Sequence, residues 1–299
     1  MRPLGQVLAA ALLVAASYIY GVVSHRDRLF PWPLIQALAS PGGAASVPDR
    51  AAPGYAGSRG RAKVACATLI GPKTAVLLTL GQSNAANYGE APYAATQPVL
   101  NFNAADGGCY LAGDPLLGAT GSGGSPWIRL GDLLVAAAVY DKVVLVPIAV
   151  GSSSVVDWAW GDAHARLVAA VHSAQSAGFS ITQVLWHQGE TDANNGMPGD
   201  EYARHLTVVV RSLRALGVQA PIFIAQASLC TGSPQNEDIR AGQRAVVAQG
   251  DGVFAGPDTD TLDGSEMRFD GCHFTARGLD AHANQWFTVL TKAAPPPKT

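Results

Sequence analysis

A hydroxyl, an imidazole and a carboxylate occur in this sequence at positions from which they could perform acyl transfer. Ser83 lies in a GQSN stretch directly after an apolar run that ends at Leu80. Far downstream, a DGCH stretch supplies Asp270 and His273. A serine hydroxyl is a weak nucleophile until a base removes its proton, and an imidazole oriented by a carboxylate is a common base for this step. We therefore predict Ser83 as the nucleophile, His273 as the base and Asp270 as the group that orients the imidazole.

Each of these residues alone has a more ordinary interpretation. Serine is favoured in turns and at helix N-termini, an isolated Asp270 would be a turn residue, and an isolated His273 would be a loop histidine. The two motifs together favour catalysis, because a simple cap requires neither partner. The remaining histidines are interpreted as ordinary packed or surface residues; they include His164, His172, His205 and His282.

The elements that must position these groups alternate along the chain. Apolar runs predict buried strands over 74–80, 142–150, 181–187 and 221–227, and amphipathic segments predict helices over 162–177, 200–216, 237–248 and 275–292. This alternation predicts a three-layer α/β/α sandwich with a mostly parallel sheet. Ligands of such folds bind at the carboxyl ends of the strands. Ser83, Gly151 and a WHQGE stretch that contains Gln188 and Glu190 all follow predicted strands, so we expect them at one edge of the sheet.

Four motifs together resemble a known family. The GQSN stretch, an AVGSSSVVDW segment, WHQGE and the late DxxH are similar, in this order and over most of residues 74–290, to the sialate O-acetylesterase branch of the SGNH/GDSL hydrolases, which includes acetylxylan esterases. The resemblance implies the SGNH type of flavodoxin-like α/β fold. It also implies a serine esterase that removes O-acetyl groups from a carbohydrate through an acetyl-enzyme, with no metal and no other cofactor.

The resemblance further implies which groups bind the oxyanion of the tetrahedral intermediate. Each such donor contributes about 3–4 kcal/mol in well-studied hydrolases. The candidates are the backbone amide of Ser83, a backbone amide in the Gly151-Ser152 turn, and the side chain of Gln188. The family usually has two glycines in this turn, so Ser152 departs from its pattern. The donor would still be a backbone N–H, although the Cβ of Ser152 would narrow the pocket.

Neighbouring polar and aromatic residues have two interpretations each. Glu190 could orient the imidazole of the predicted base, but a structural role that holds the loops together is favoured. Asn84 and Asn87 could contact substrate, with turn closure favoured for both, and Asn84 is grouped with Glu190 as supporting the site. Trp158 and Trp160 could form a wall on which a sugar stacks, or they could simply pack beneath the loops.

Other functions remain open or are disfavoured. A lipase, a thioesterase or an O-acetyltransferase could use the same triad, and an inactive glycan-binding module of the cell envelope could retain the sheet. There is no GxSxG elbow, no P-loop and no GxGxxG after a strand, which disfavours an ordinary α/β-hydrolase and nucleotide cofactors. The 20 basic and 22 acidic residues give a net charge of −2, which offers no large positive field for nucleic acid.

The ends of the chain differ in composition from its middle. Residues 1–28 contain an apolar stretch with flanking arginines. The length of this stretch is close to the roughly 20 residues that span a bilayer, so it predicts an uncleaved membrane anchor. Cleavage after Ala16 is the alternative. Residues 29–63 predict a flexible Pro/Gly/Ala-rich linker, 64–293 the catalytic domain, and 294–299 a disordered tail. The domain would then lie in the periplasm, or be secreted if the anchor is removed. The oligomeric state is left open.

Four cysteines, Cys66, Cys109, Cys230 and Cys272, permit two disulfides in an exported chain, with three possible pairings. Spacing alone does not choose among them. We favour Cys66 with Cys109 and Cys230 with Cys272, because the latter two lie in loops expected at the same end of the sheet. The absence of a CxxC pair disfavours a zinc site.

Overall fold

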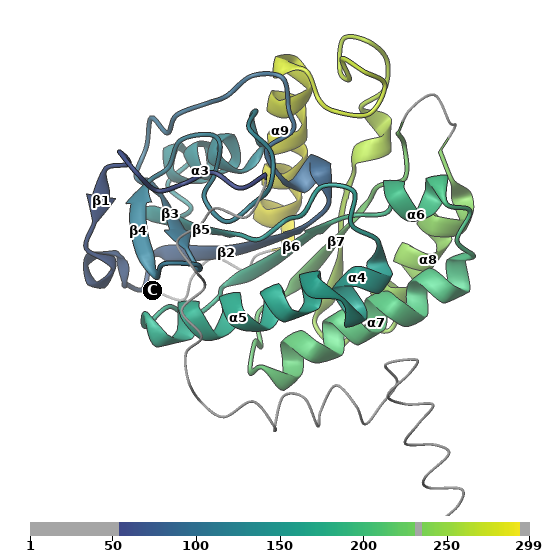
Figure 1. The fold of residues 1–299 in the computed structure, drawn as a ribbon, viewed down its shortest axis with the longest axis horizontal. Helices are drawn as coiled ribbons and strands as arrows, with labels where there is room; N and C mark the ends of the chain where they lie inside the picture. The colour runs from purple at the N-terminus through teal and green to yellow at the C-terminus, as the bar shows by residue number, and fades with distance from the viewer. Residues whose placement is uncertain (1–53, 231–234, 294–299) are drawn as a thin grey trace, which may run out of the picture. The chain divides into compact units, whose positions relative to one another are not determined.

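A central sheet lies between two layers of helices in the computed structural model, which describes residues 54–230 and 235–293 (Figure 1). The predicted α/β/α sandwich with a mostly parallel sheet is confirmed. The described strands run in the order β1-β4-β3-β5-β2-β6-β7-β8. Only the β1–β4 and β3–β4 pairs among them are antiparallel. The strands are β1 (Lys63–Val64), β2 (Thr74–Gly81), β3 (Val99–Asn103), β4 (Gly108–Leu111), β5 (Lys142–Pro147), β6 (Gln183–His187), β7 (Ile222–Gln226) and β8 (Val253–Asp258).

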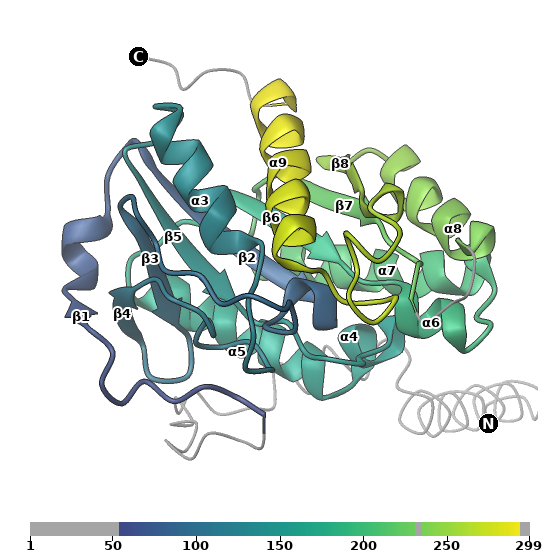
Figure 2. The same cartoon turned by 90° about the horizontal axis from the view of Figure 1, so that it is seen from above.

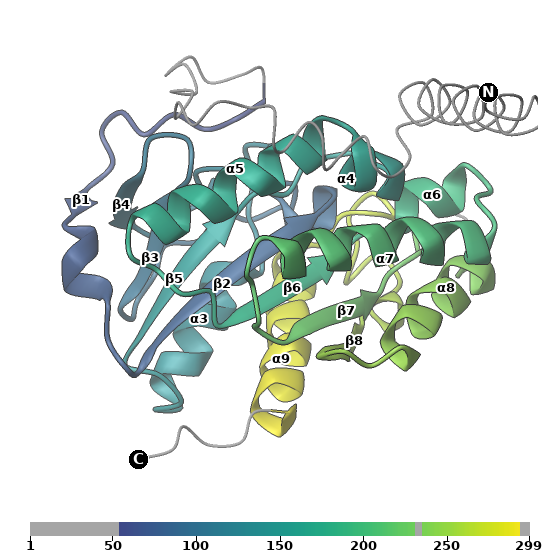
Figure 3. The same ribbon diagram turned by 90° about the horizontal axis from the view of Figure 1, so that it is seen from below.

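Helices cover both faces of the sheet, as the two turned views show (Figures 2 and 3). Successive side chains of a strand point to opposite faces. Leu78 and Trp186 accordingly pack in the core shared with α4, α5, α7 and α8, whereas Leu77 and Leu185 pack with α3 and α9. The helices and 3-10 turns are η1 (Cys66–Leu69), η2 (Ser83–Ala85), α3 (Trp127–Ala136), α4 (Val155–Trp160), α5 (Asp162–Ser176), α6 (Glu190–Asn194), α7 (Gly199–Ala215), α8 (Glu237–Ala248), η3 (Thr259–Thr261) and α9 (Ala276–Ala293).

The four predicted strands correspond to β2, β5, β6 and β7, and the four predicted helices to α5, α7, α8 and α9. Sequence patterns did not identify β3, β4, β8 or α3. The β8 strand contains Gly256 and Pro257, two residue types that are depleted in strands. The β3–β4 pair is a short antiparallel hairpin, which the expectation of strand–helix alternation does not anticipate.

Part of the predicted linker packs on the domain. Arg61 donates hydrogen bonds to the carbonyl oxygens of Gly113 and Pro115, at 2.6 and 2.7 Å. Tyr55 lies beneath the guanidinium of Arg166, 4.0 Å from its central carbon. The ordered domain therefore begins before the predicted boundary at residue 64.

The predicted anchor at 1–28, most of the predicted linker and the predicted tail at 294–299 lie outside the described residues. Within 54–230 and 235–293, none of the helices is both long and apolar enough to cross a bilayer.

Both favoured disulfide pairings are confirmed. Cys66–Cys109 connects η1 to β4, and Cys230–Cys272 connects the segment after β7 to the DGCH loop before α9. The two bridges span nearly equal lengths of chain, 43 and 42 residues.

Candidate active site

Ser83 lies at the carboxyl edge of the sheet, two residues beyond Gly81, the last residue of β2 that pairs with β6. Gly81 pairs with His187 at the end of these strands, and a Cβ on Gly81 would lie 1.9 Å from the His187 carbonyl oxygen. Its φ of 135° is likewise one that glycine tolerates best. Ser83 is 5% exposed, and its hydroxyl has no hydrogen-bond partner among the described residues.

Asp270 and His273 form a hydrogen-bonded pair in the loop before α9. The His273 Nδ1–H donates to Asp270 Oδ2 at 2.6 Å, while Oδ1 accepts the backbone amides of Cys272 and His273 at 2.9 and 2.7 Å. Burial alone would raise the pKa of Asp270, but the hydrogen bonds from the imidazole and the two amides outweigh it and lower the pKa. The carboxylate therefore stays ionised and orients the imidazole so that Nε2 is the nitrogen available for proton transfer.

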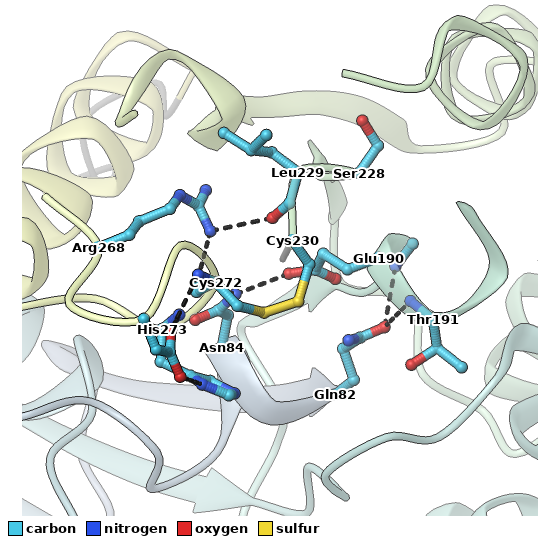
Figure 4. Close-up of a disulfide and its surroundings, with 12 residues drawn as sticks. Gln82, Asn84, Glu190, Thr191, Ser228, Leu229, Cys230, Arg268, Cys272 and His273 are labelled. Atoms are coloured by element: carbon cyan, nitrogen blue, oxygen red, sulfur yellow. Dashed lines mark hydrogen bonds and ion pairs between the residues drawn. A yellow bond between two sulfur atoms is a disulfide. The ribbon is translucent and has the colours of Figure 1, made fainter. Parts of the chain in front are cut away.

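Asn84 connects the serine segment to the histidine loop. Its Nδ2 donates to the carbonyl oxygen of Cys272 at 3.2 Å and to Glu190 Oε1 at 2.9 Å (Figure 4). Asn84 follows Ser83 in the sequence, and Cys272 precedes His273. One hydrogen bond thus brings the two predicted catalytic motifs together, although they lie 188 residues apart in the sequence.

The Cys272 carbonyl is also held from the other side. Arg268 is fully buried and donates to it at 2.5 Å, and to the Leu229 carbonyl at 3.1 Å (Figure 4). The Cys230–Cys272 disulfide lies at the same junction. The loop that carries His273 is therefore held by covalent and polar bonds at once.

Gly151 and Ser152 are the two turn residues predicted as backbone donors to the oxyanion. Of their two N–H groups, only that of Ser152 is free of an acceptor among the described residues. The Gly151 N–H donates to Thr120 Oγ1 at 2.7 Å. The N–H groups of Ser83 and Ser152 have no acceptor among the described residues. Ser152 has a φ of 58°, in the left-handed region that favours glycine.

Gln188 does not fit the predicted role of an oxyanion donor. Its side chain is fully buried, and its Nε2 donates to Asp192 and lies 3.2 Å from both the Ser153 carbonyl oxygen and Gln82 Oε1. Its Oε1 accepts the Tyr202 hydroxyl at 3.0 Å. An amide nitrogen has only two hydrogens. Both are used inside the protein, so Gln188 supports the floor of the site and has no donor left for substrate.

Glu190 is buried and bonds to Asn84 and His187 rather than to His273. Its Oε1 lies 3.2 Å from His187 Nε2. Burial alone would raise the pKa of Glu190, but the adjacent His187 and the hydrogen bonds from His187 and Asn84 lower it to about 2. In this geometry Glu190 connects the β6–α6 junction to the serine loop, which is the structural interpretation of this residue, and Asp270 orients the imidazole.

The ring nitrogens of His187, His282 and Trp286 extend the hydrogen-bonded network from Glu190. The indole N–H of Trp286 donates to His282 Nε2 at 3.0 Å, and His187 Nδ1 lies 3.1 Å from the same atom. An indole N–H can only donate, so His282 Nε2 accepts from Trp286. Burial, His187 and Arg268 lower the pKa of His282. His187 therefore connects His282 to Glu190 through its two ring nitrogens.

The aromatic residues beside the site differ from those predicted. Trp158 is fully buried and donates from Nε1 to Ser153 Oγ at 2.8 Å, so it packs beneath the loops and cannot stack on a sugar. Trp160 is half-buried, with its Nε1 3.2 Å from His205 Nδ1. Asn87 is also buried and donates to the carbonyl oxygens of Leu116 and Ala119, so its side chain holds the loop before α3 and does not close its own turn.

Tyr88 is a site residue that sequence reasoning missed. Its ring stacks on His273, with centroids 5.6 Å apart and an interplanar angle of 22°. A Cβ on Gly151 would lie 2.4 Å from the Tyr88 hydroxyl oxygen, so glycine there makes room for this side chain. The only signal in the sequence is an aromatic residue five positions after Ser83.

Comparisons with known proteins identify the family of the chain. The family described as "Carbohydrate esterase, sialic acid-specific acetylesterase" matches residues 73–288. A probable carbohydrate esterase of Arabidopsis thaliana is 26% identical over 100 residues, which span 33% of this chain and 38% of the relative's length.

Two solved structures share the fold. An Arabidopsis thaliana protein aligns with a TM-score of 0.60 and 17% identity, over 75% of this chain and 99% of that protein. A family 3 carbohydrate esterase of Clostridium thermocellum aligns with a TM-score of 0.51 and 13% identity, over 74% of this chain and 96% of that protein.

We predict that Glu190→Gln destabilises the protein in a pH-dependent way. At pH 7 the free energy of unfolding should fall by about 3 kcal/mol, because the change removes a buried carboxylate to which Asn84 and His187 bond. The folded-state pKa of Glu190 lies below its ordinary value, so its stabilisation is present above about pH 4.5 and is lost as the pH falls toward about 2. Urea unfolding of both proteins across this range should show the difference shrinking. Glu237→Gln, at an exposed carboxylate of α8, is the control. A pH-independent difference for Glu190→Gln would contradict the lowered pKa of Glu190.

The two disulfides should have equal effects on stability and unequal effects on activity. Replacing either pair by serines should lower the free energy of unfolding by about 2–4 kcal/mol, because the closed loops are nearly equal in length. Loss of Cys230–Cys272 should in addition reduce ester hydrolysis at least tenfold at a temperature where both variants remain folded, because this bridge holds the His273 loop. Equal activities of the two double variants would show that the bridge does not position that loop.

Proposed function

The chain belongs to the carbohydrate esterase family of sialic acid-specific acetylesterases, and from this premise we propose that it removes O-acetyl groups from a carbohydrate through a Ser83-His273-Asp270 triad. As a member of this family it is a carboxylic ester hydrolase. The observation that carries the proposed triad is the 2.6 Å bond between Asp270 and His273 in a loop that Asn84 connects to the nucleophile segment. A free serine hydroxyl beside an oriented imidazole is the arrangement that acyl transfer requires.

In the proposed mechanism, Ser83 Oγ attacks the acetyl carbonyl carbon while His273 Nε2 takes its proton. The backbone N–H groups of Ser83 and Ser152 donate to the oxyanion of the tetrahedral intermediate. When the ester bond breaks, His273 gives the proton to the leaving sugar oxygen. Water then attacks the acetyl-enzyme, with the same imidazole as base, and acetate and Ser83 are released. Asp270 stabilises the imidazolium in both steps.

Single replacements should separate the proposed triad from its support. Ser83→Ala and Asp270→Asn should each lower kcat for release of acetate from an acetylated sugar by about 10⁴-fold or more, as nucleophile and orienter losses do in serine hydrolases. Ser176→Ala on the exposed end of α5 and Asp263→Asn in an exposed turn are matched controls. If Glu190→Gln abolished activity while Asp270→Asn retained it, Glu190 would be the orienter and the proposed triad would be wrong.

Substrate profiling distinguishes the alternatives. A preference for long-chain p-nitrophenyl esters over the acetate would indicate a lipase or thioesterase, and transfer of acetyl to an added sugar in preference to water would indicate a transferase. A wild-type protein that hydrolyses no short ester would be an inactive binding module, and the proposal would fail.

We further propose that the domain acts outside the cytoplasm, anchored through residues 1–28 or released after their cleavage. The two disulfides support this location, because such bonds persist in oxidising compartments. Protein isolated from its native cells with a thiol-blocking reagent present, then denatured without reductant, should have no alkylated cysteine and should fractionate with the envelope or the medium. A cytosolic protein with four alkylated cysteines would contradict the proposal.

A further inference from the structure

An exposed phenylalanine lies beside the proposed base. Phe269 is 48% exposed, and its ring centroid is 6.1 Å from that of His273, with an interplanar angle of 30°. Its backbone N–H donates to the His273 carbonyl oxygen at 3.0 Å. Among the described residues, five large apolar side chains are exposed, and Phe269 is the one in ring contact with His273: Ile70, Leu111, Val156, Phe254 and Phe269.

The exposure of Phe269 does not come from a loosely held loop. The preceding residue, Arg268, is buried and packs its guanidinium 4.4 Å from the ring centroid of Phe274. It also donates to four backbone carbonyls, those of Leu229, Thr259, Leu262 and Cys272. The chain on either side of Phe269 is therefore fixed, and its phenyl ring is held in solvent next to His273.

Tyr88 and Phe269 approach His273 from different directions, because their rings do not contact each other within the described part of the chain. The Tyr88 hydroxyl lies against Gly151, next to the free amide of Ser152. The Tyr88 side is therefore the side of the oxyanion and the acyl group. In the proposed mechanism, this leaves the Phe269 side of the imidazole for the alcohol portion of the ester.

The chemistry brings the alcohol portion close to this ring. Its oxygen must come within hydrogen-bond distance of His273 Nε2, about 3 Å, to receive the proton. In an acetylated pyranose, the ring carbons begin one bond beyond that oxygen. A pyranose has a face made of C–H groups, and an exposed aromatic ring can bury that face from water.

We propose that Phe269 is the surface on which the sugar ring of the substrate packs, and that it selects acetylated pyranoses over acetates of small alcohols. This inference rests on the proposed esterase function. It places the sugar-binding aromatic residue in the DGCH loop, since Trp158 is buried.

The test compares two acetyl esters that differ in the alcohol: a monoacetylated methyl pyranoside and ethyl acetate. For Phe269→Ala, KM for the pyranoside ester should rise about tenfold, equivalent to about 1.4 kcal/mol of binding. The kcat for the same ester should change less than about twofold, because packing against the sugar is equal in the ground and transition states. The kcat/KM for ethyl acetate should fall much less than that for the pyranoside ester, and Phe269→Trp should restore the wild-type KM for the pyranoside.

Phe254→Ala is a matched control, because this phenylalanine is 45% exposed and lies at the amino end of β8, at the edge of the sheet away from Ser83. It should alter neither ester's kinetics, and thermal unfolding of each variant checks that the fold is intact. Equal losses of Phe269→Ala on both esters, or no loss on the pyranoside, would overturn the inference while leaving the esterase function standing. A wild-type protein that hydrolyses neither ester would overturn the proposed function and this inference with it.

Discussion

The arrangement of the site depends on one carbonyl oxygen, that of Cys272. It accepts hydrogen bonds from Asn84, beside the proposed nucleophile, and from Arg268, on the histidine loop itself. A carbonyl has two lone pairs, and here both are used, one for each of the segments that must meet. The disulfide to Cys230 limits the movement of the same residue. The segment after a central strand and a loop near the end of the domain, which carry Ser83 and His273, are thereby held together.

This junction requires charge to be buried, and the structure compensates each buried charge locally. Glu190 accepts from Asn84 and from His187, whose other ring nitrogen lies 3.1 Å from His282 Nε2. Arg268 uses four backbone carbonyls and the face of Phe274. A buried pair gains little net stability over apolar packing, whereas loss of one partner is costly. Such a network therefore defines one geometry more strongly than it stabilises the fold.

The differences from the predicted site share one cause, the direction in which a side chain leaves its element. Gln188 and Trp158 occupy predicted rim segments, yet both side chains point inward and are satisfied by internal partners. Gly151 and Ser152 are neighbours, yet the N–H of one is used by Thr120 while that of the other is free. Position in a motif places a residue near the edge of the sheet and does not specify whether its polar atoms turn toward substrate.

Sequence alone determined the layered α/β/α architecture, the central strands, the family and the DxxH pair, because periodic burial and short-range spacing are local properties. It did not reveal β3, β4, β8 or α3, whose patterns are weak without their neighbours. Only the tertiary structure decided that Asn84 bonds to the Cys272 carbonyl, that Glu190 pairs with His187, and that Tyr88 and Phe269 flank the imidazole. Apart from Glu190 with His187, these contacts join residues far apart in the chain or depend on the course of a loop, and a single sequence carries no distance information for either.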